Sequence, residues 1–360
     1  MKAEYPFYNC ATKYHHNNMY SSLEARLLLP IKTLAFGVPP HTFTDYFQMS
    51  KALAAEACKH FDNIISILYL KEYLRQPSSQ DLKSINKLHK EVHGIEGMFA
   101  SLDCMHTYWK NCPKAWAGQF QGKEKKPTIV LEAACDYNTW FWHASYGYSG
   151  SMNDIQVFDL SPLLESFVDG SFSNAEKEVG SFCIGGTYFD LMFLLVDGIY
   201  PKIARFVKAC KMPITIDEEK FTAWQESKRK DIERAFGILQ SQWQFIRNGI
   251  LLMNLNMLSQ RITSCIILHN ICVSDRIMGD VYKRYDPSYS ICDDNEINEL
   301  RSNVEIENND ENVAVGVGIS NMPRNIQLAF ADLNRYGDLM NEHYFINLNK
   351  SLMKEICDNY

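Results

Sequence analysis

The chain has 360 residues, of which 46% are apolar and 22% are charged. This balance is typical of a globular protein with a substantial core, and it excludes a wholly disordered chain. No apolar run reaches the length of about eighteen residues that a membrane-spanning helix needs. The first residues contain no apolar signal segment, so we expect neither a membrane span nor secretion.

The eleven cysteines are scattered, and none of them forms a CxxC pair. In a chain of this length without a secretion signal, this usage predicts reduced thiols in a nuclear or cytoplasmic protein. The formal net charge of −7 argues at first against a nucleic-acid partner. However, residues 275–360 carry 16 of the 43 acidic side chains and only 8 of the 36 basic ones. The rest of the chain is therefore close to neutral and can present a local basic face.

The first part of the chain, residues 1–95, is predicted to be helical. Apolar residues recur at helical spacing from Leu53 to Leu68, with Ser50 as the expected N-cap. A turn at 37–40 and a short helix at 41–47 precede this helix, which resembles a helix-turn-helix. A plain helical scaffold explains the same pattern, so both interpretations stay open. Pro30 is expected to kink or restart the helix before the turn.

The second part, residues 96–275, changes in character. Short apolar runs predict strands, and longer periodic stretches near 155–167 and 222–243 predict helices. The expected strands cover residues 98–103, 127–134, 140–146 and 193–196. This pattern indicates an α/β fold, in which helices pack on a mixed sheet.

The third part, residues 276–360, is polar and acidic. We expect a tail that is largely disordered or loosely attached, with one short helix within 325–342.

Three acids of the second part occupy promising positions. Asp103 and Asp197 are each expected to close a short apolar strand, and Glu233 lies beside the buried stripe of its helix. Converging carboxylates suit hard cations such as Mg²⁺ or Mn²⁺, and two such ions can drive phosphodiester cleavage. As a spacing alone the signal is weak, because a chain with 43 acids offers many such triples.

Seven motifs make the pattern specific. In chain order they are FASLDCMH (99–106), WKNCP (109–113), KPTIVLEA (126–133), GSMNDI (150–155), DGIYP (197–201), RKDIERAFG (229–237) and IILHN (266–270). This series resembles the transposases and transposase-derived nucleases of PIF/Harbinger elements, and the helical region from about 25 to 88 is similar to the N-terminal part of that family.

The resemblance implies an RNase H-like fold and DDE-type, metal-dependent phosphodiester chemistry. Asp103 and Asp197 match the two catalytic aspartates of the family, and Glu233 matches its glutamate. Asp154 matches a further acidic position, where it is either another metal ligand or the cap of the helix that begins there. The resemblance also implies DNA as substrate, a Myb-like DNA-binding partner protein and a nuclear location. The oligomeric state stays open.

Basic residues near these acids are candidates for DNA contact. Lysines in the segment 106–126 alternate with Trp109, Trp116 and Phe120, a mixture that suits a phosphate backbone and unstacked bases. The predicted DNA contacts are Lys110, Lys123, Lys125, Lys126, Lys230 and Arg234. The alternatives are an ordinary exposed loop for the first four and a solvated helix face, with weak salt bridges, for the last two.

Three further polar residues lie in or near the motifs. His106 follows Asp103 closely and is either a contact to the scissile phosphate or a structural hydrogen-bonding residue. His269 and Asn270, on the last apolar helix, are expected to be buried hydrogen-bonding residues. The sequence thus predicts a metal-dependent DNA endonuclease of transposase origin. A domesticated DNA-binding or scaffold protein that no longer cleaves is the alternative.

Overall fold

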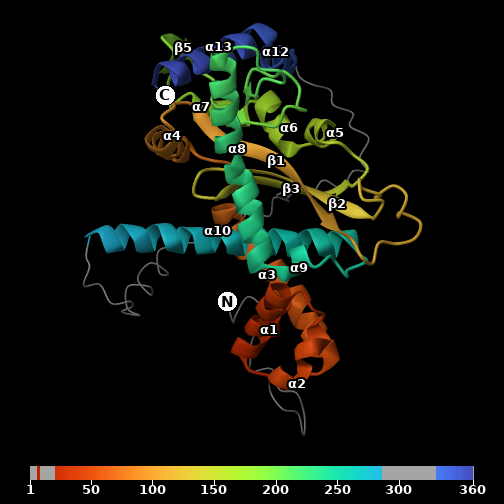
Figure 1. Ribbon diagram of the computed structural model, residues 1–360. Helices are drawn as coiled ribbons and strands as arrows, with labels where there is room; N and C mark the ends of the chain where they lie inside the picture. The colour runs from red at the N-terminus through yellow and green to blue at the C-terminus, as the bar shows by residue number, and fades with distance from the viewer. Residues whose placement is uncertain (1–5, 9–20, 286–329, 360) are drawn as a thin grey trace.

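The computed structural model describes residues 6–8, 21–285 and 330–359. Its centre is a five-stranded mixed sheet with the strand order β3-β2-β1-β6-β7 (Figure 1). These strands are β1 (Met98–Tyr108), β2 (Thr128–Cys135), β3 (Phe141–Ser149), β6 (Phe193–Leu195) and β7 (Phe206–Val207). β1, β2 and β3 pair antiparallel, whereas β6 runs parallel to β1, and β7 runs parallel to β6. A hairpin of β4 (Phe182–Ile184) and β5 (Thr187–Phe189) lies apart from this sheet.

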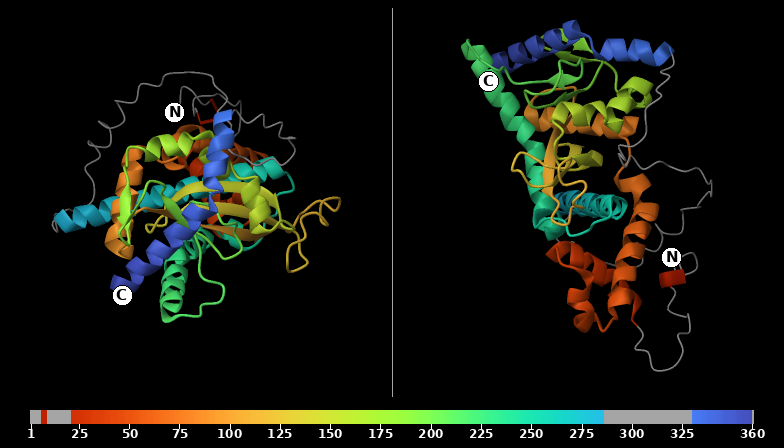
Figure 2. Two further views of the ribbon diagram at one scale, coloured as in Figure 1. Left: turned by 90° about the horizontal axis from the view of Figure 1, so that it is seen from above. Right: turned by 90° about the vertical axis from the view of Figure 1, so that its right-hand side faces the viewer.

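Helices surround the sheet on both faces (Figures 1 and 2). The N-terminal helices are η1 (Pro6–Tyr8), α1 (Leu23–Phe36), η2 (Pro40–Phe43), α2 (Thr44–Phe47), α3 (Lys51–Tyr73) and α4 (Ser79–His93). Those that follow are α5 (Asp154–Asp159), α6 (Pro162–Asp169), α7 (Ser171–Glu176), α8 (Ile216–Gln242), α9 (Gln244–Arg247), α10 (Leu255–Tyr285), α12 (Phe330–Leu339) and α13 (Glu342–Asn359). The expected α/β class with helices on a mixed sheet is confirmed.

Side chains of the sheet alternate between two cores, as the period of a strand requires. Leu102 of β1 belongs to a core built with α4, α6, α7 and α13. Met105, three residues on, belongs to a second core built with α1, α3, α8 and α10. The sheet is thus buried on both faces, and its chemistry must lie at an edge or at a strand end.

The N-terminal helices follow the expected boundaries, with one exception. The Ser50 hydroxyl accepts a hydrogen bond from the backbone of Leu53 and caps α3. Gly37 ends α1 with a φ of 64°, and a β-carbon there would lie 2.6 Å from the backbone of Gln244. The expectation that Pro30 restarts the helix is wrong, since α1 continues through it. Pro30 removes one helical hydrogen bond, but it is buried beside Leu29 and tertiary packing holds the helix together.

The contact between α3 and α10 joins the N-terminal helices to the sheet layer. A buried ion pair connects these two helices, with Arg261 Nε of α10 lying 2.8 Å from Asp62 Oδ2 of α3. The Ser264 hydroxyl donates a further hydrogen bond to the Asp62 carbonyl. Most of residues 21–95 are helical, as expected, and a helix-turn-helix role stays a prediction.

The expectation of a loosely attached tail is wrong for α13. Its residues Leu348, Leu352 and Ile356 are buried in the first core. The helix packs against α8 and β7 and is amphipathic, so the acidic composition of the region concealed an apolar stripe. The short helix expected within 325–342 corresponds to α12, while 286–329 lie outside the described residues.

Two negative observations concern the described ranges alone. In them no helix combines the length and the apolar character needed to cross a bilayer. The cysteines that they contain are all free thiols.

His89 provides a prediction about acid stability. Its Nδ1 donates to the Met98 carbonyl at 2.8 Å, and its Nε2 accepts from the Tyr137 backbone at 3.1 Å, so the neutral ring is fully bonded. Burial lowers the pKa of His89 to about 4. The unfolded chain binds a proton near pH 6.5 and the folded chain does not, so stability is lost as the pH falls from 6.5 towards 4.

We therefore expect urea unfolding to show that His89→Gln is less stable than the wild type at pH 7. Between pH 7 and 4.5 the variant should also lose less free energy of unfolding than the wild type. The difference should be about 1.4 kcal/mol for each unit by which folding lowers the His89 pKa. A variant with the same loss as the wild type would contradict this assignment.

Candidate metal centre and nucleic-acid interface

The strand register brings Asp103 and Asp197 together. Ser101 of β1 pairs with Leu195 of β6 in parallel. Asp103 lies two residues further along β1, and Asp197 lies two residues beyond Leu195, the last residue of β6, so the two acids leave the paired region on the same side. The two acids influence each other electrostatically, since Asp197 helps to raise the pKa of Asp103. The predicted proximity of these two residues is therefore seen in the structure.

One expectation about this pair is wrong. Asp103 does not close its strand, because β1 continues for five more residues and pairs with β2 as far as Tyr108. Cys104 and His106 continue the strand after the acid and are only partly buried, which hides the extension from an apolar pattern. Asp197 does follow β6 as expected, and its Oδ1 accepts a hydrogen bond from Gly198 at 2.7 Å.

Asp154 is the third member of the cluster. The cap of α5 is Asn153, which forms a capping box with Gln156, so the alternative role of Asp154 as the cap is wrong. Burial raises the pKa of the Asp154 carboxyl, Lys123 and His106 lower it, and Asp197 raises it further. The Asp154 carboxyl is therefore close enough to Asp197 for their charges to interact.

Glu233 of α8 reaches the site through Arg229. Arg229 Nη1 lies 3.0 Å from Asp103 Oδ2, and Nη2 lies 3.2 Å from Glu233 Oε1. Asp103 and Arg229 have 19% and 18% of their side chains exposed, whereas Glu233 is 50% exposed. Glu233 thus lies at the open rim of the site, beside the buried stripe of its helix as the sequence predicts.

The Asp103 carboxyl is held in an unfavourable charged state. Burial raises its pKa, the Cys104 amide and the Arg229 guanidinium lower it, and Asp154 and Asp197 raise it again. Because the neighbouring negative charges disfavour the ionised form of Asp103, the site attracts a cation.

The donor chemistry of the cluster fits a hard divalent cation, since all four candidate ligands are carboxylates. In the described part of the chain, however, no group of three or more His, Cys, Asp or Glu side chains is close enough to hold an ion as it stands. Arg229 instead lies between two of the candidates. A bound ion would therefore require these side chains to move together.

A basic loop lies on one side of the carboxylates. The segment 109–127 between β1 and β2 projects from the body (Figure 2, left) and carries Lys110, Lys123, Lys125 and Lys126, all exposed. Lys123 is near both Asp154 and His106, and His106 Nδ1 lies 3.1 Å from the Thr128 hydroxyl. His106 thus makes a structural contact and also faces the site.

The aromatic residues of this loop differ from the expectation. Trp109 and Phe120 are buried, and the Trp109 indole donates to the Leu252 carbonyl at 2.7 Å. They anchor the base of the loop and cannot stack on bases. Trp116 packs on both of them but remains 42% exposed, so it alone of the three can meet a nucleic acid.

The two basic residues predicted on α8 are placed differently. Lys230 is exposed, while Arg234 pairs with Asp231 and donates to the Tyr137 carbonyl at the β2–β3 turn. Arg234 therefore turns away from the Arg229–Glu233 side of the helix. Sequence reasoning missed Lys208, which follows β7 and is close enough to Asp197 for the two charges to interact. The one signal in the sequence that could have identified Lys208 is the pair of basic residues, Lys208 and Lys211, that follows β7.

The DNA contacts can be tested by salt dependence. We expect Lys123→Ser to weaken binding of a DNA duplex and to reduce the slope of log affinity against log salt by about one unit, because one phosphate contact is lost. Fluorescence anisotropy at several salt concentrations measures both. Arg234→Ser is the comparison, and its slope should stay that of the wild type. Equal slopes for wild type and Lys123→Ser would remove this loop from the interface.

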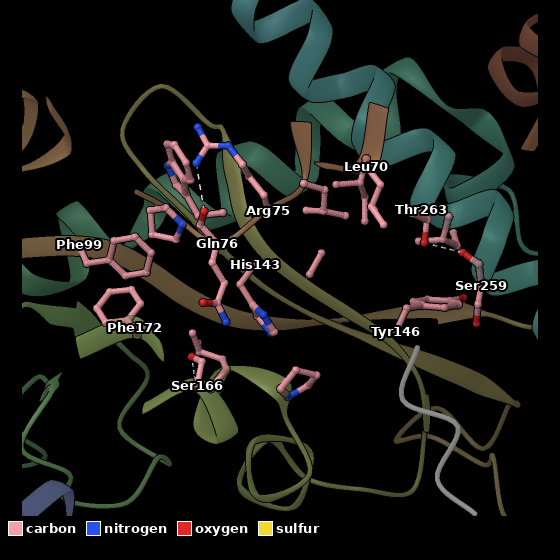
Figure 3. A pocket seen from close by; sticks show the side chains of 18 residues that line it. Leu70, Arg75, Gln76, Phe99, His143, Tyr146, Ser166, Phe172, Ser259 and Thr263 are labelled. Carbon is pink, nitrogen blue, oxygen red and sulfur yellow. Dashed lines mark hydrogen bonds between the residues drawn. The ribbon is translucent and has the colours of Figure 1, made fainter. Parts of the chain in front are cut away.

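A separate cavity of about 390 Å³ lies among α3, β3, α6 and α10 (Figure 3). Its walls are mostly apolar, and His143 lies beside it, with Nε2 2.9 Å from the fully buried Glu132. The Ser161 hydroxyl donates to the same Glu132 carboxylate. The Ser161 hydroxyl and the Glu132 carboxylate both approach Nε2 of His143. A catalytic triad requires them on different ring nitrogens, so these three residues do not form one. None of the predicted site residues lines this cavity.

Fold and site together define an α/β protein with a carboxylate cluster where the parallel and antiparallel parts of its sheet meet. A family model described as plant transposon protein matches residues 71–280, which include the whole sheet and every candidate ligand. The match covers more than half of the chain, and the protein belongs to this plant transposon protein family. No curated protein and no solved structure gives a match.

Proposed function

We propose that the protein is a metal-dependent DNA endonuclease of the PIF/Harbinger transposase type, which uses a DDE site. The observation that carries the proposal is the pairing of Ser101 with Leu195, because Asp103 follows Ser101 along β1 and Asp197 follows the end of β6 at the same distance in sequence. Membership of a transposon protein family makes DNA the natural substrate. The order of three antiparallel strands followed by two parallel ones supports an RNase H-like sheet.

In this proposal Asp103, Asp154, Asp197 and Glu233 hold the divalent ions, Mg²⁺ or Mn²⁺. Two such ions supply activation of a water and stabilisation of the leaving oxygen when bound. The chain itself positions the DNA: Lys123, near Asp154, and Lys208, near Asp197, meet the phosphates flanking the cut. The partly buried floor around Asp103 strengthens each of these charge interactions relative to water.

The partners and location follow from the resemblance to PIF/Harbinger elements. We propose a Myb-like DNA-binding protein as the partner for site recognition and the nucleus as the place of action.

The test is cleavage of a labelled duplex that carries the terminal repeats of the element, with the partner protein and with Mg²⁺ or Mn²⁺. We expect metal-dependent nicking that is lost in Asp197→Asn and in Glu233→Gln. Glu91→Gln, an exposed acid on α4, should cut like the wild type. Binding of metal and DNA without nicking would instead identify a non-cleaving DNA-binding protein.

A further inference from the structure

Arg229 lies where a cation would be expected between two carboxylates. Its guanidinium reaches Asp103 Oδ2 with one nitrogen, at 3.0 Å, and Glu233 Oε1 with the other, at 3.2 Å. The side chain is largely buried, so its charge acts in a medium of low polarity. One turn of α8 separates Arg229 from Glu233, a spacing that places both on the same face of the helix.

The surroundings explain why a positive charge is held there. Asp103 is close to Asp154 and Asp197, and both raise its pKa, whereas Arg229 lowers it. The charge of Lys123 interacts with Asp154, and that of Lys208 interacts with Asp197. Each of these lysines lies in a loop. Arg229 is fixed on a long helix and directly contacts two candidate ligands.

We propose that Arg229 is a resident counter-cation that competes with the divalent ion for Asp103 and Glu233. This inference rests on the proposed function, because it concerns the same four carboxylates. An oxygen that accepts from a guanidinium at this distance has less capacity for an ion, and two cations at one carboxylate repel each other. Arg229 therefore withdraws before Asp103 and Glu233 can act as ligands, and its charge lowers the affinity of the site for metal.

The test measures metal affinity without any cleavage. Mn²⁺ is titrated by calorimetry into the full chain and into Arg229→Gln, whose amide keeps polarity and loses the charge. We expect the variant to bind Mn²⁺ at least about tenfold more tightly, which corresponds to about 1.4 kcal/mol. In EDTA the variant should unfold at a lower temperature than the wild type, and Mn²⁺ should raise that temperature more than it does for the wild type.

Two further variants sharpen the result. Arg234→Gln removes a charge from the same helix, but Arg234 pairs with Asp231, so Mn²⁺ affinity should stay at the wild-type value. Arg229→Lys keeps the charge without the two-armed contact and should bind Mn²⁺ with intermediate affinity. It also provides a folded comparison if the glutamine variant does not fold.

The outcomes separate the two proposals. The role of Arg229 would be overturned if Arg229→Gln and Arg229→Lys bind Mn²⁺ no more tightly than the wild type. The metal site itself would stand in that case, because the wild-type protein still binds Mn²⁺. If neither the wild-type protein nor any folded variant binds Mn²⁺, both the metal site and the role of Arg229 are excluded. A purely structural arginine would lower stability without raising metal affinity.

Discussion

Asp103→Asn should reduce DNA cleavage by at least about 10³-fold, equal to about 4 kcal/mol of activation barrier, and should not destabilise the protein. The loss follows because the amide is a poor ligand for a divalent ion and Asp103 lies on the strand that pairs with β6, which Asp197 follows. The stability should hold because burial and the two neighbouring aspartates raise the pKa of Asp103. The folded site therefore already disfavours the charged form that the substitution removes.

Single-turnover cleavage and thermal unfolding without metal measure the two effects. The control is Glu165→Gln, an exposed acid of α6, which should change neither. Cleavage by Asp103→Asn within tenfold of the wild-type rate would exclude Asp103 from the reaction. A large fall in its unfolding temperature would mean that the ion pair with Arg229 outweighs repulsion among the acids.

Glu176→Ala should lower the free energy of unfolding by about 3–5 kcal/mol, because it leaves a buried guanidinium without its counter-charge. Both side chains of the Glu176–Arg205 pair are 3% exposed. The contact is two-armed, with both Arg205–Glu176 distances at 2.7 Å, and Glu176 also accepts from the Met192 backbone. This cluster joins α7 to the segment between β6 and β7 that follows Asp197.

A double-mutant cycle checks the origin of this loss. In Glu176→Leu with Arg205→Met the buried charges disappear together, and Phe167 and Phe172, which flank Arg205, can pack on the methionine. The double variant should recover a substantial part of the stability that Glu176→Ala loses. Additive losses measured by urea unfolding would show that the pair contributes little beyond the packing of each residue.

Local chemistry made much of the fold predictable. The Ser50 cap, the turn at Gly37 and the strand that ends before Asp197 each depend on a few neighbouring residues. His269 and Asn270 are buried and hydrogen-bonded, as expected: Asn270 binds both backbone groups of Phe141, and His269 donates to the Thr139 carbonyl. Asn270 satisfies the edge of β3 and His269 a carbonyl just before it, which is why a polar pair can lie on an apolar helix.

The remainder depended on contacts between distant segments. The continuation of β1 through Asp103 is fixed by pairing with β2, and the burial of Trp109 is fixed by a carbonyl more than a hundred residues away. The Arg229–Asp103 contact likewise joins residues 126 positions apart. The sequence offered only the four-residue spacing of Arg229 and Glu233, which is equally compatible with a solvated helix face.

The packing of α13 has a consequence for the fate of gene copies. Leu348, Leu352 and Ile356 belong to the first core, so this core is closed only when residues 342–359 have been made. A copy with a stop codon ahead of residue 342 retains Asp103, Asp154, Asp197 and Glu233 but exposes the apolar surfaces of α8 and β7. Such a copy would encode an aggregation-prone product, so the presence of codons for all four candidate metal ligands is an insufficient criterion for a folded protein.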